Sequence, residues 1–135
     1  IIAGHPKTRG FNLQKYFKKR KIFYDQTEAL VKFSDFIITR NSAAFSYGII
    51  HQKPIICILN KEFMADKNFM QVASGLWHEL SLQPTRVDNE KSIYNSLKNL
   101  SFNKKVYKKF KYHYLLNNLD LTNQELIIEA FKKHI

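Results

Sequence analysis

The chain has 135 residues, of which 44% are hydrophobic and 24% charged, and at this length we expect one globular domain with a single core. Four Gly and three Pro exclude collagen-like and low-complexity classes, and the apolar content excludes a wholly disordered chain. Lys and Arg number 22 against 11 Asp and Glu, so the formal net charge is +11, which favours anionic partners such as phosphates, nucleic acid or acidic lipid.

The predicted strands are short runs of β-branched and aromatic residues that alternate with helical patterns. They cover residues 1–4, 22–24, 36–39, 55–59 and 85–87. The single cysteine, Cys57, stands inside the fourth run, and we expect it to be a small buried side chain.

Helical patterns fill most of the intervals between these strands. Asp25 and Glu28 have the spacing of a capping box and predict a short helix that ends near Ser34. The other helices are expected over residues 11–17, 41–50, 68–80, 88–100 and 103–116, and from Thr122 to the end of the chain, with Asn41 or Ser42, Asp88 and Thr122 as caps.

Strands separated by helical crossovers predict an α/β fold, because parallel neighbours need long right-handed connections. We expect one domain over residues 1–135, with an open, Rossmann-like parallel sheet of about five strands and helices on both faces. A basic helical tail, residues 103–135, would pack on it. In such sheets, ligands bind beyond the carboxyl ends of the strands, where helix N-termini present free amides to anions.

The turn after the first strand could hold a phosphate. His5, Lys7 and Arg9 bring an imidazole and two cations to the strand end, and Pro6 fixes the loop. The alternative is a solvated loop in which His5 only caps the sheet.

The turn after the third strand has a similar character. Arg40 supplies positive charge, the Ser42 hydroxyl supplies a donor, and the small residues Ala43 and Ala44 let a diphosphate approach the backbone amides. The alternative is that Asn41 and Ser42 are simple helix caps.

Together the two turns resemble a known family. A strand that ends in His-Pro, an acidic-capped short helix and the segment SDFIITRNSAAFSYGIIHQKPIICI are similar to the C-terminal nucleotide-binding half of GT-B glycosyltransferases. The likeness is greatest to bacterial capsule and surface-polysaccharide enzymes, including Kdo transferases, sialyltransferases and glycerophosphotransferases. The family pattern, roughly "HP…, ad.vit.nSt…eal..gkPvi", covers residues 1–59.

The resemblance implies a glycosyltransferase donor domain that holds a CMP-, CDP- or UDP-linked sugar for transfer to a surface-polysaccharide or lipid-linked acceptor. It places His5 and Pro6 at the motif that contacts the nucleotide and Ser42 at the serine that binds the donor phosphate. The chain departs from the family pattern at Ala43, where a second Ser or Thr is usual, and at Tyr47, near an often acidic position.

In that family the catalytic acidic residue and the acceptor site lie largely in an N-terminal half. The resemblance implies that residues 1–135 correspond to the other half, so it assigns no catalytic residue here. Asp25 and Glu28 are interpreted as helix caps. Glu62 and Asp66, after the fourth strand, could contact a sugar or ribose, or could lie in a solvated loop. No cofactor is expected, and no metal, because the five histidines are scattered without ligand spacing: His5, His51, His78, His113 and His134.

A nucleic-acid-binding module without catalysis is the rival interpretation, because residues 104–114 interleave lysines with aromatic residues. We favour an inward stripe for Val106, Phe110 and Tyr114, because they follow helical spacing. A third interpretation is that the lysines dock on anionic lipid, which would suit an enzyme with a lipid-linked acceptor. The stretch 41–52 is too short and polar to span a bilayer, so we expect a cytoplasmic protein. Under the third interpretation, it would be peripheral to the inner face of the plasma membrane.

Overall fold

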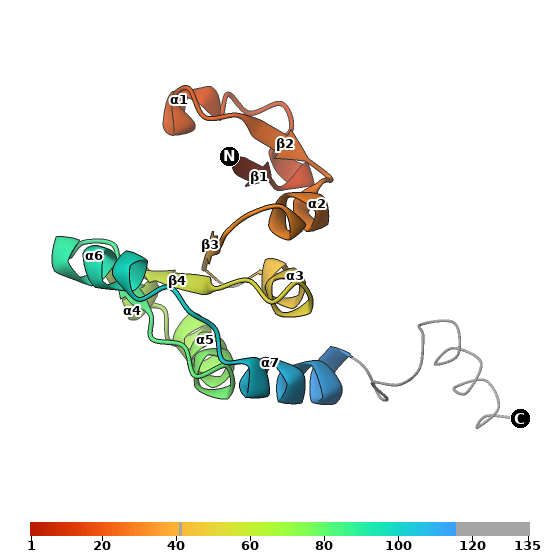
Figure 1. Ribbon diagram of the computed structural model, residues 1–135. Helices are drawn as coiled ribbons and strands as arrows, with labels where there is room; N and C mark the ends of the chain where they lie inside the picture. The colour runs from red at the N-terminus through yellow and green to blue at the C-terminus, as the bar shows by residue number, and fades with distance from the viewer. Residues whose placement is uncertain (41, 116–135) are drawn as a thin grey trace, which may run out of the picture.

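The computed structural model describes residues 1–40 and 42–115 (Figure 1). Helices and strands alternate through this part of the chain, which confirms the α/β class. The predicted terminal helix from Thr122 lies outside the described residues. The elements are β1 (Ile2–Gly4), the 3₁₀ turn η1 (Pro6–Thr8), α1 (Gln14–Phe17), β2 (Ile22–Tyr24), α2 (Thr27–Lys32), β3 (Ile37–Thr39), α3 (Ala44–Ile50), β4 (Ile55–Leu59), α4 (Lys61–Ala65), α5 (Lys67–Glu79), β5 (Thr85–Arg86), α6 (Glu90–Lys98), α7 (Lys104–Phe110) and the π-helical turn η2 (Lys111–Leu115).

All five predicted strands form, and every pair among them is parallel. The strands divide into a two-stranded sheet, β1–β2, and a three-stranded sheet in the order β3–β4–β5. Ile2 lies opposite Ile22 in the first sheet, and Ile37 lies opposite Ile55 in the second. The residue patterns predicted where the strands form, but they do not show which strands pair. Strands of three residues form few hydrogen bonds to a neighbour, and β2 and β3 do not pair. The five strands therefore form two hydrogen-bonded sheets and not the single sheet that was expected.

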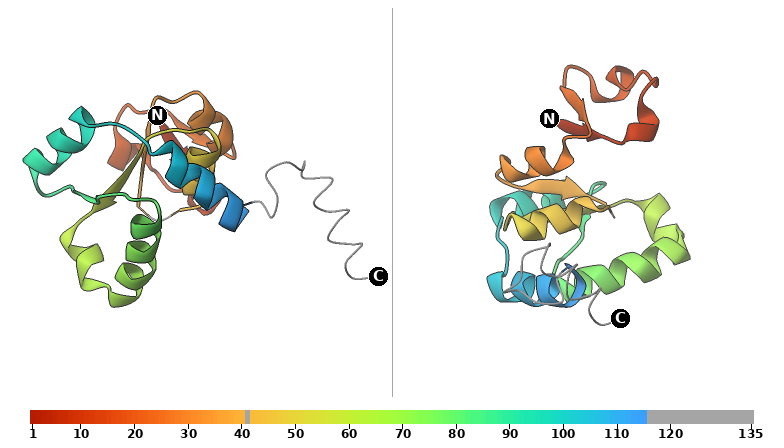
Figure 2. Two further views of the ribbon diagram at one scale, coloured as in Figure 1. Left: turned by 60° about the horizontal axis from the view of Figure 1, so that its bottom comes forward. Right: turned by 90° about the vertical axis from the view of Figure 1, so that its right-hand side faces the viewer.

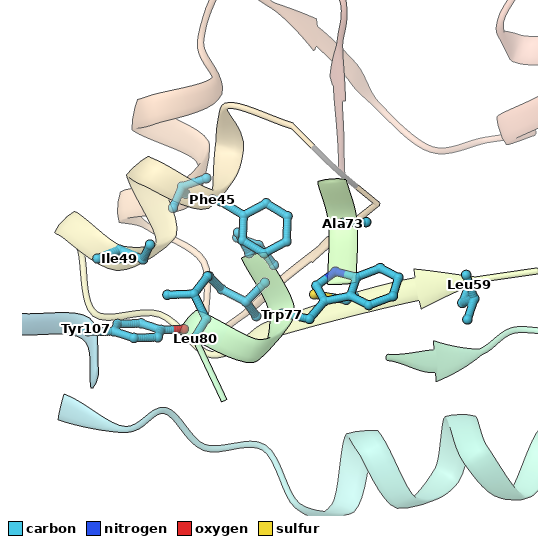
Figure 3. Close-up of a cluster of buried hydrophobic side chains, with 11 residues drawn as sticks. Phe45, Ile49, Leu59, Ala73, Trp77, Leu80 and Tyr107 are labelled. Carbon is cyan, nitrogen blue, oxygen red and sulfur yellow. The ribbon is translucent and has the colours of Figure 1, made fainter. Parts of the chain in front are cut away.

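One hydrophobic core lies between β4 and the helices α3, α5 and α7 (Figure 3). Every second residue of β4 points into it, namely Ile55, Cys57 and Leu59. Cys57 is fully buried, as predicted, and burial raises the pKa of its thiol to about 12, so the thiol stays protonated near neutral pH. The helices contribute Phe45, Ile49, Ala73, Trp77, Leu80 and Tyr107.

Helix α3 lies close against β3 and β4 because Gly48 has no side chain at the contact. A Cβ at this position would lie 2.9 Å from Ile37 Cδ1 and 3.0 Å from Ile55 Cδ1. Both isoleucines belong to the core. This close approach fixes the position of the β3–α3 turn relative to the sheet.

The opposite face of the sheet is open at β3. Ile37 is buried in the core, whereas the next residue, Ile38, is 58% exposed. Successive strand residues point to opposite faces, so Ile38 marks the side away from α3 and α5.

The predicted cap of α2 is wrong. Gln26, without a side-chain cap bond, precedes the helix at Thr27, and Asp25 has a left-handed φ of 57°. The Asp25 carboxylate pairs instead with the guanidinium of Arg9. Because Asp25 binds the guanidinium of Arg9, its carboxylate does not cap the amides at the start of α2.

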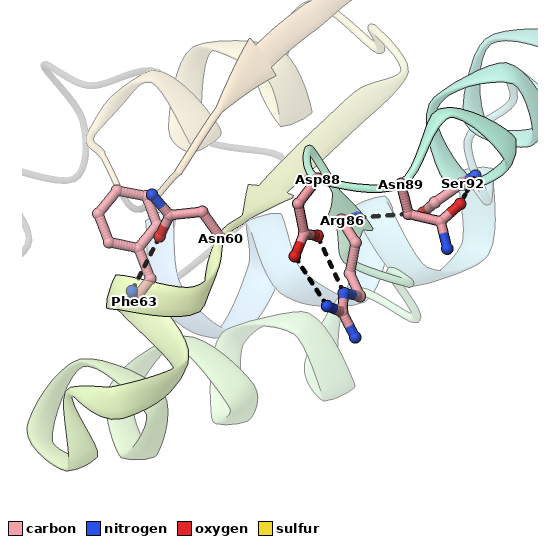
Figure 4. A network of polar contacts seen from close by, with 6 residues as sticks. All are labelled: Asn60, Phe63, Arg86, Asp88, Asn89 and Ser92. Carbon is pink, nitrogen blue, oxygen red and sulfur yellow. Dashed lines mark hydrogen bonds and ion pairs between the residues drawn. The ribbon is translucent and has the colours of Figure 1, made fainter.

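The predicted cap of α6 is wrong for the same reason. Asp88 accepts hydrogen bonds from Arg86 Nε at 3.1 Å and from its terminal nitrogen at 2.8 Å. The following residue, Asn89, caps the helix by accepting a bond from the Ser92 amide at 3.1 Å (Figure 4).

Candidate functional site

The turn after β1 is organised around His5. Its Nδ1 accepts a hydrogen bond from the Lys7 amide at 3.1 Å, and the Thr8 hydroxyl donates to its carbonyl at 2.7 Å. Pro6 opens the 3₁₀ turn that follows. Because Nδ1 is an acceptor, Nε2 carries the proton of the neutral ring and is the atom that can donate to an anion.

The positive charge of Arg9 is partly neutralised at this turn. Its guanidinium pairs with Asp25 and lies 5.4 Å from the centroid of the Tyr24 ring. The two side chains of the ion pair are 58% and 55% exposed, so the pair adds little stability, but it neutralises the charge locally. At this turn, the groups that remain to bind a phosphate are the Lys7 ammonium and the Nε2–H group of His5.

Arg40, directly after β3, is held by aromatic rings. Its guanidinium carbon lies 4.3 Å from the centroid of the Phe63 ring in α4 and 5.4 Å from that of Phe69 in α5. Among the described residues, no carboxylate forms an ion pair with Arg40. The rings thus position the cation at the carboxyl end of the sheet and leave its charge uncompensated there.

Ser42 and Ala43 form the entry to α3. The exposed Ser42 hydroxyl oxygen accepts a hydrogen bond from the Ala44 amide at 3.2 Å, and Ala43 precedes the first helical residue. A hydroxyl that accepts one bond still has its own proton to donate, so capping and phosphate binding are compatible roles for Ser42. Asn41 lies outside the described residues.

Glu62 and Asp66 lie in and beside a helix, not in the solvated loop that was one of the two expectations. Asn60 caps α4 by accepting a bond from the Phe63 amide at 2.9 Å (Figure 4). Asp66 caps α5 by accepting one from the Phe69 amide at 3.0 Å. Glu62 stands exposed in the first turn of α4, one position before Phe63.

The carboxyl end of β5 carries a pair that sequence reasoning missed. Asp88 is hydrogen-bonded to Arg86, and this bond, together with the positive charges of Arg86 and Lys61, lowers the pKa of the Asp88 carboxyl (Figure 4). The signal was available, since the two residues are only two positions apart in the chain. Phe63 and Phe69 were also missed, and nothing in their spacing connects them with Arg40.

The structure gathers the predicted site residues into two groups. One group, at the end of β1, contains His5, Pro6, Lys7 and Arg9. Among the described residues, no hydrogen bond or ion pair joins it to the other, and the views in Figures 1 and 2 show the β1–β2 pair set apart from the larger sheet. The other group, at the ends of β3 and β4, contains Arg40, Ser42, Ala43, Glu62 and Asp66.

Two open depressions lie elsewhere on the molecule. The larger, about 760 Å³, is lined by α5 together with Phe110 and Tyr114, and the smaller, about 380 Å³, is lined by α7 and η2. Within residues 1–40 and 42–115, no three His, Cys, Asp or Glu side chains gather as a metal site would require, and no helix has the length and apolar character to cross a bilayer. Comparison with protein-family models, with curated proteins and with solved structures found no match.

Proposed function

We propose that the chain is the donor-binding domain of a GT-B glycosyltransferase. It would hold the phosphate of a CMP-, CDP- or UDP-linked sugar at the carboxyl ends of the parallel strands. The observation that supports this is Arg40, a cation held on two aromatic rings beside the entry of α3, with no carboxylate partner among the described residues. An anion at this position would meet the positive charge of Arg40, and the Ser42 hydroxyl, two positions further along the chain, would be a second donor.

In this proposal the domain stabilises the leaving group. Breaking the bond between sugar and phosphate leaves negative charge on the phosphate oxygens, which Arg40 and Ser42 would contact. His5 would donate a hydrogen bond from its Nε2–H group to the same nucleotide, which requires one ligand to span the ends of β1 and β3. The base that activates the acceptor would belong to a separate acceptor-binding half, and the domain would act in the cytoplasm.

The test is the thermal unfolding of the chain with CMP, CDP and UDP. A nucleotide at about 100 times its Kd should raise the melting temperature by roughly 10 °C. Arg40→Gln should remove this shift. Arg20→Gln is the matched control, because Arg20 is an exposed arginine before β2 and its loss changes the net charge equally.

The two variants separate a site from general electrostatics. If both reduce the shift equally, the nucleotide responds only to net charge and the proposed site is refuted. If none of the three nucleotides changes the melting temperature of the parent chain, the donor-domain proposal itself is refuted.

A further inference from the structure

Helix α7 has one face fixed in the core. Tyr107 is 2% exposed, and its hydroxyl donates a hydrogen bond to the Lys53 carbonyl at 3.0 Å. The Phe102 ring lies 5.3 Å from the Tyr107 ring, and Val106 and Phe110 pack against the same core. The rotation of the helix about its axis is therefore set, and so is the side that it presents to solvent. The predicted inward stripe is wrong at Tyr114, which is 60% exposed.

The opposite side of α7, continued into η2, is a cationic face, which we define as Lys105, Lys108, Lys109, Tyr112 and His113. These residues recur at helical spacing and line the shallow depression of about 380 Å³. All five are exposed, and Tyr112 is 47% exposed. Figure 1 shows α7 at the periphery of the molecule.

Acidic residues are missing from the stretch of sequence that carries the cationic face. From residue 91 to residue 115 the chain contains no Asp or Glu. Lysines three and four positions apart on one helix repel one another, which destabilises α7 as long as no anion lies nearby. The lysines in this stretch are Lys91, Lys98, Lys104, Lys105, Lys108, Lys109 and Lys111.

We propose that the cationic face docks on an anionic lipid bilayer. Three features favour lipid headgroups over nucleic acid as the occupant. The cations are all lysines, with no arginine after Arg86, so the face offers mobile point charges and lacks the rigid guanidinium fork that suits nucleic-acid recognition. The amphipathic ring of Tyr112 suits the headgroup level, and one helix presents a face that a flat surface can approach. The inference does not depend on the nucleotide-binding proposal.

The test measures co-sedimentation of the chain with phosphatidylcholine vesicles that contain, or lack, about one-third phosphatidylglycerol. The chain should bind only the anionic vesicles, and binding should fall steeply as salt is added. The variant K105Q/K108Q/K109Q should bind about 100-fold more weakly, at about five-fold for each lysine. The control K15Q/K19Q/K21Q removes three exposed lysines near α1 and should bind within about five-fold of the parent chain.

Several results would overturn the proposal. They are the absence of vesicle binding by the parent chain at low salt, an equal loss of binding in the two triple variants, and tighter binding to a single-stranded oligonucleotide that only K105Q/K108Q/K109Q abolishes. Because the lysine substitutions leave Arg40 and Ser42 intact, the nucleotide-induced melting shift should persist in both variants. The two proposals can therefore fail separately.

Discussion

Replacing Gly48 by alanine tests how closely α3 must lie against the sheet. The new Cβ would lie 2.9 Å from Ile37 Cδ1 and 3.0 and 3.1 Å from Ile55 Cδ1 and Cγ1. Moving two packed core side chains costs about 1–3 kcal/mol. Alanine regains about 1 kcal/mol through its better helix propensity, so we expect a net loss of about 1 kcal/mol in the free energy of unfolding.

Gly75→Ala supplies the matched reference. Gly75 lies within α5 and is exposed, and a Cβ there would meet nothing within 4 Å. This substitution should stabilise the chain by about 0.5–1 kcal/mol. Both variants gain the same helix propensity, so the difference between them isolates the steric cost at Gly48.

Urea unfolding measures both variants on one scale. A difference of about 2 kcal/mol should separate their midpoints by roughly 1 M. Coincident midpoints, or a Gly48→Ala variant more stable than the parent chain, would show that α3 does not need its close contact with β3 and β4.

Two further predictions concern buried groups of the core. Burial raises the pKa of the Cys57 thiol from 9.0 to about 12, so the unfolded chain loses this proton first as the pH rises. Its contribution to stability is complete below pH 9 and is lost between pH 9 and about 12, and Cys57→Ala should flatten the alkaline decline in urea stability by up to about 1.4 kcal/mol per pH unit. An unchanged slope would contradict this. Tyr107→Phe removes the hydrogen bond to the Lys53 carbonyl and should cost about 1 kcal/mol in the same assay, whereas a variant as stable as the parent would mean that the bond contributes nothing.

The strands were predictable because short runs of apolar, β-branched residues are typical of buried strands. The run 55–59 is apolar throughout, as expected of a strand buried on both faces, and it forms β4 with the predicted bounds. Helix α4 was missed, since five residues are too few for a helical period to emerge. Its one local signal is Asn60, a preferred capping residue directly after the strand.

The side-chain partners of the caps were harder to predict, because a capping residue has competitors that the local pattern does not show. Asp25 has the correct spacing for a cap, but Arg9 reaches it from 16 residues away through the pairing of β1 with β2. Such a contact exists only after the sheet has formed.

The three arginines at strand ends show how the fold assigns different roles to the same side chain. Arg9 and Arg86 pair with Asp25 and Asp88. Arg40 rests on rings that stabilise its position but do not cancel its charge. A phosphate approaching the carboxyl ends of the strands would therefore gain most from Arg40, and would have to compete with a carboxylate at the other two. Under the proposed function, Arg40→Gln should therefore reduce the nucleotide-induced rise in melting temperature more than Arg9→Gln, although the sequence alone does not distinguish the two residues.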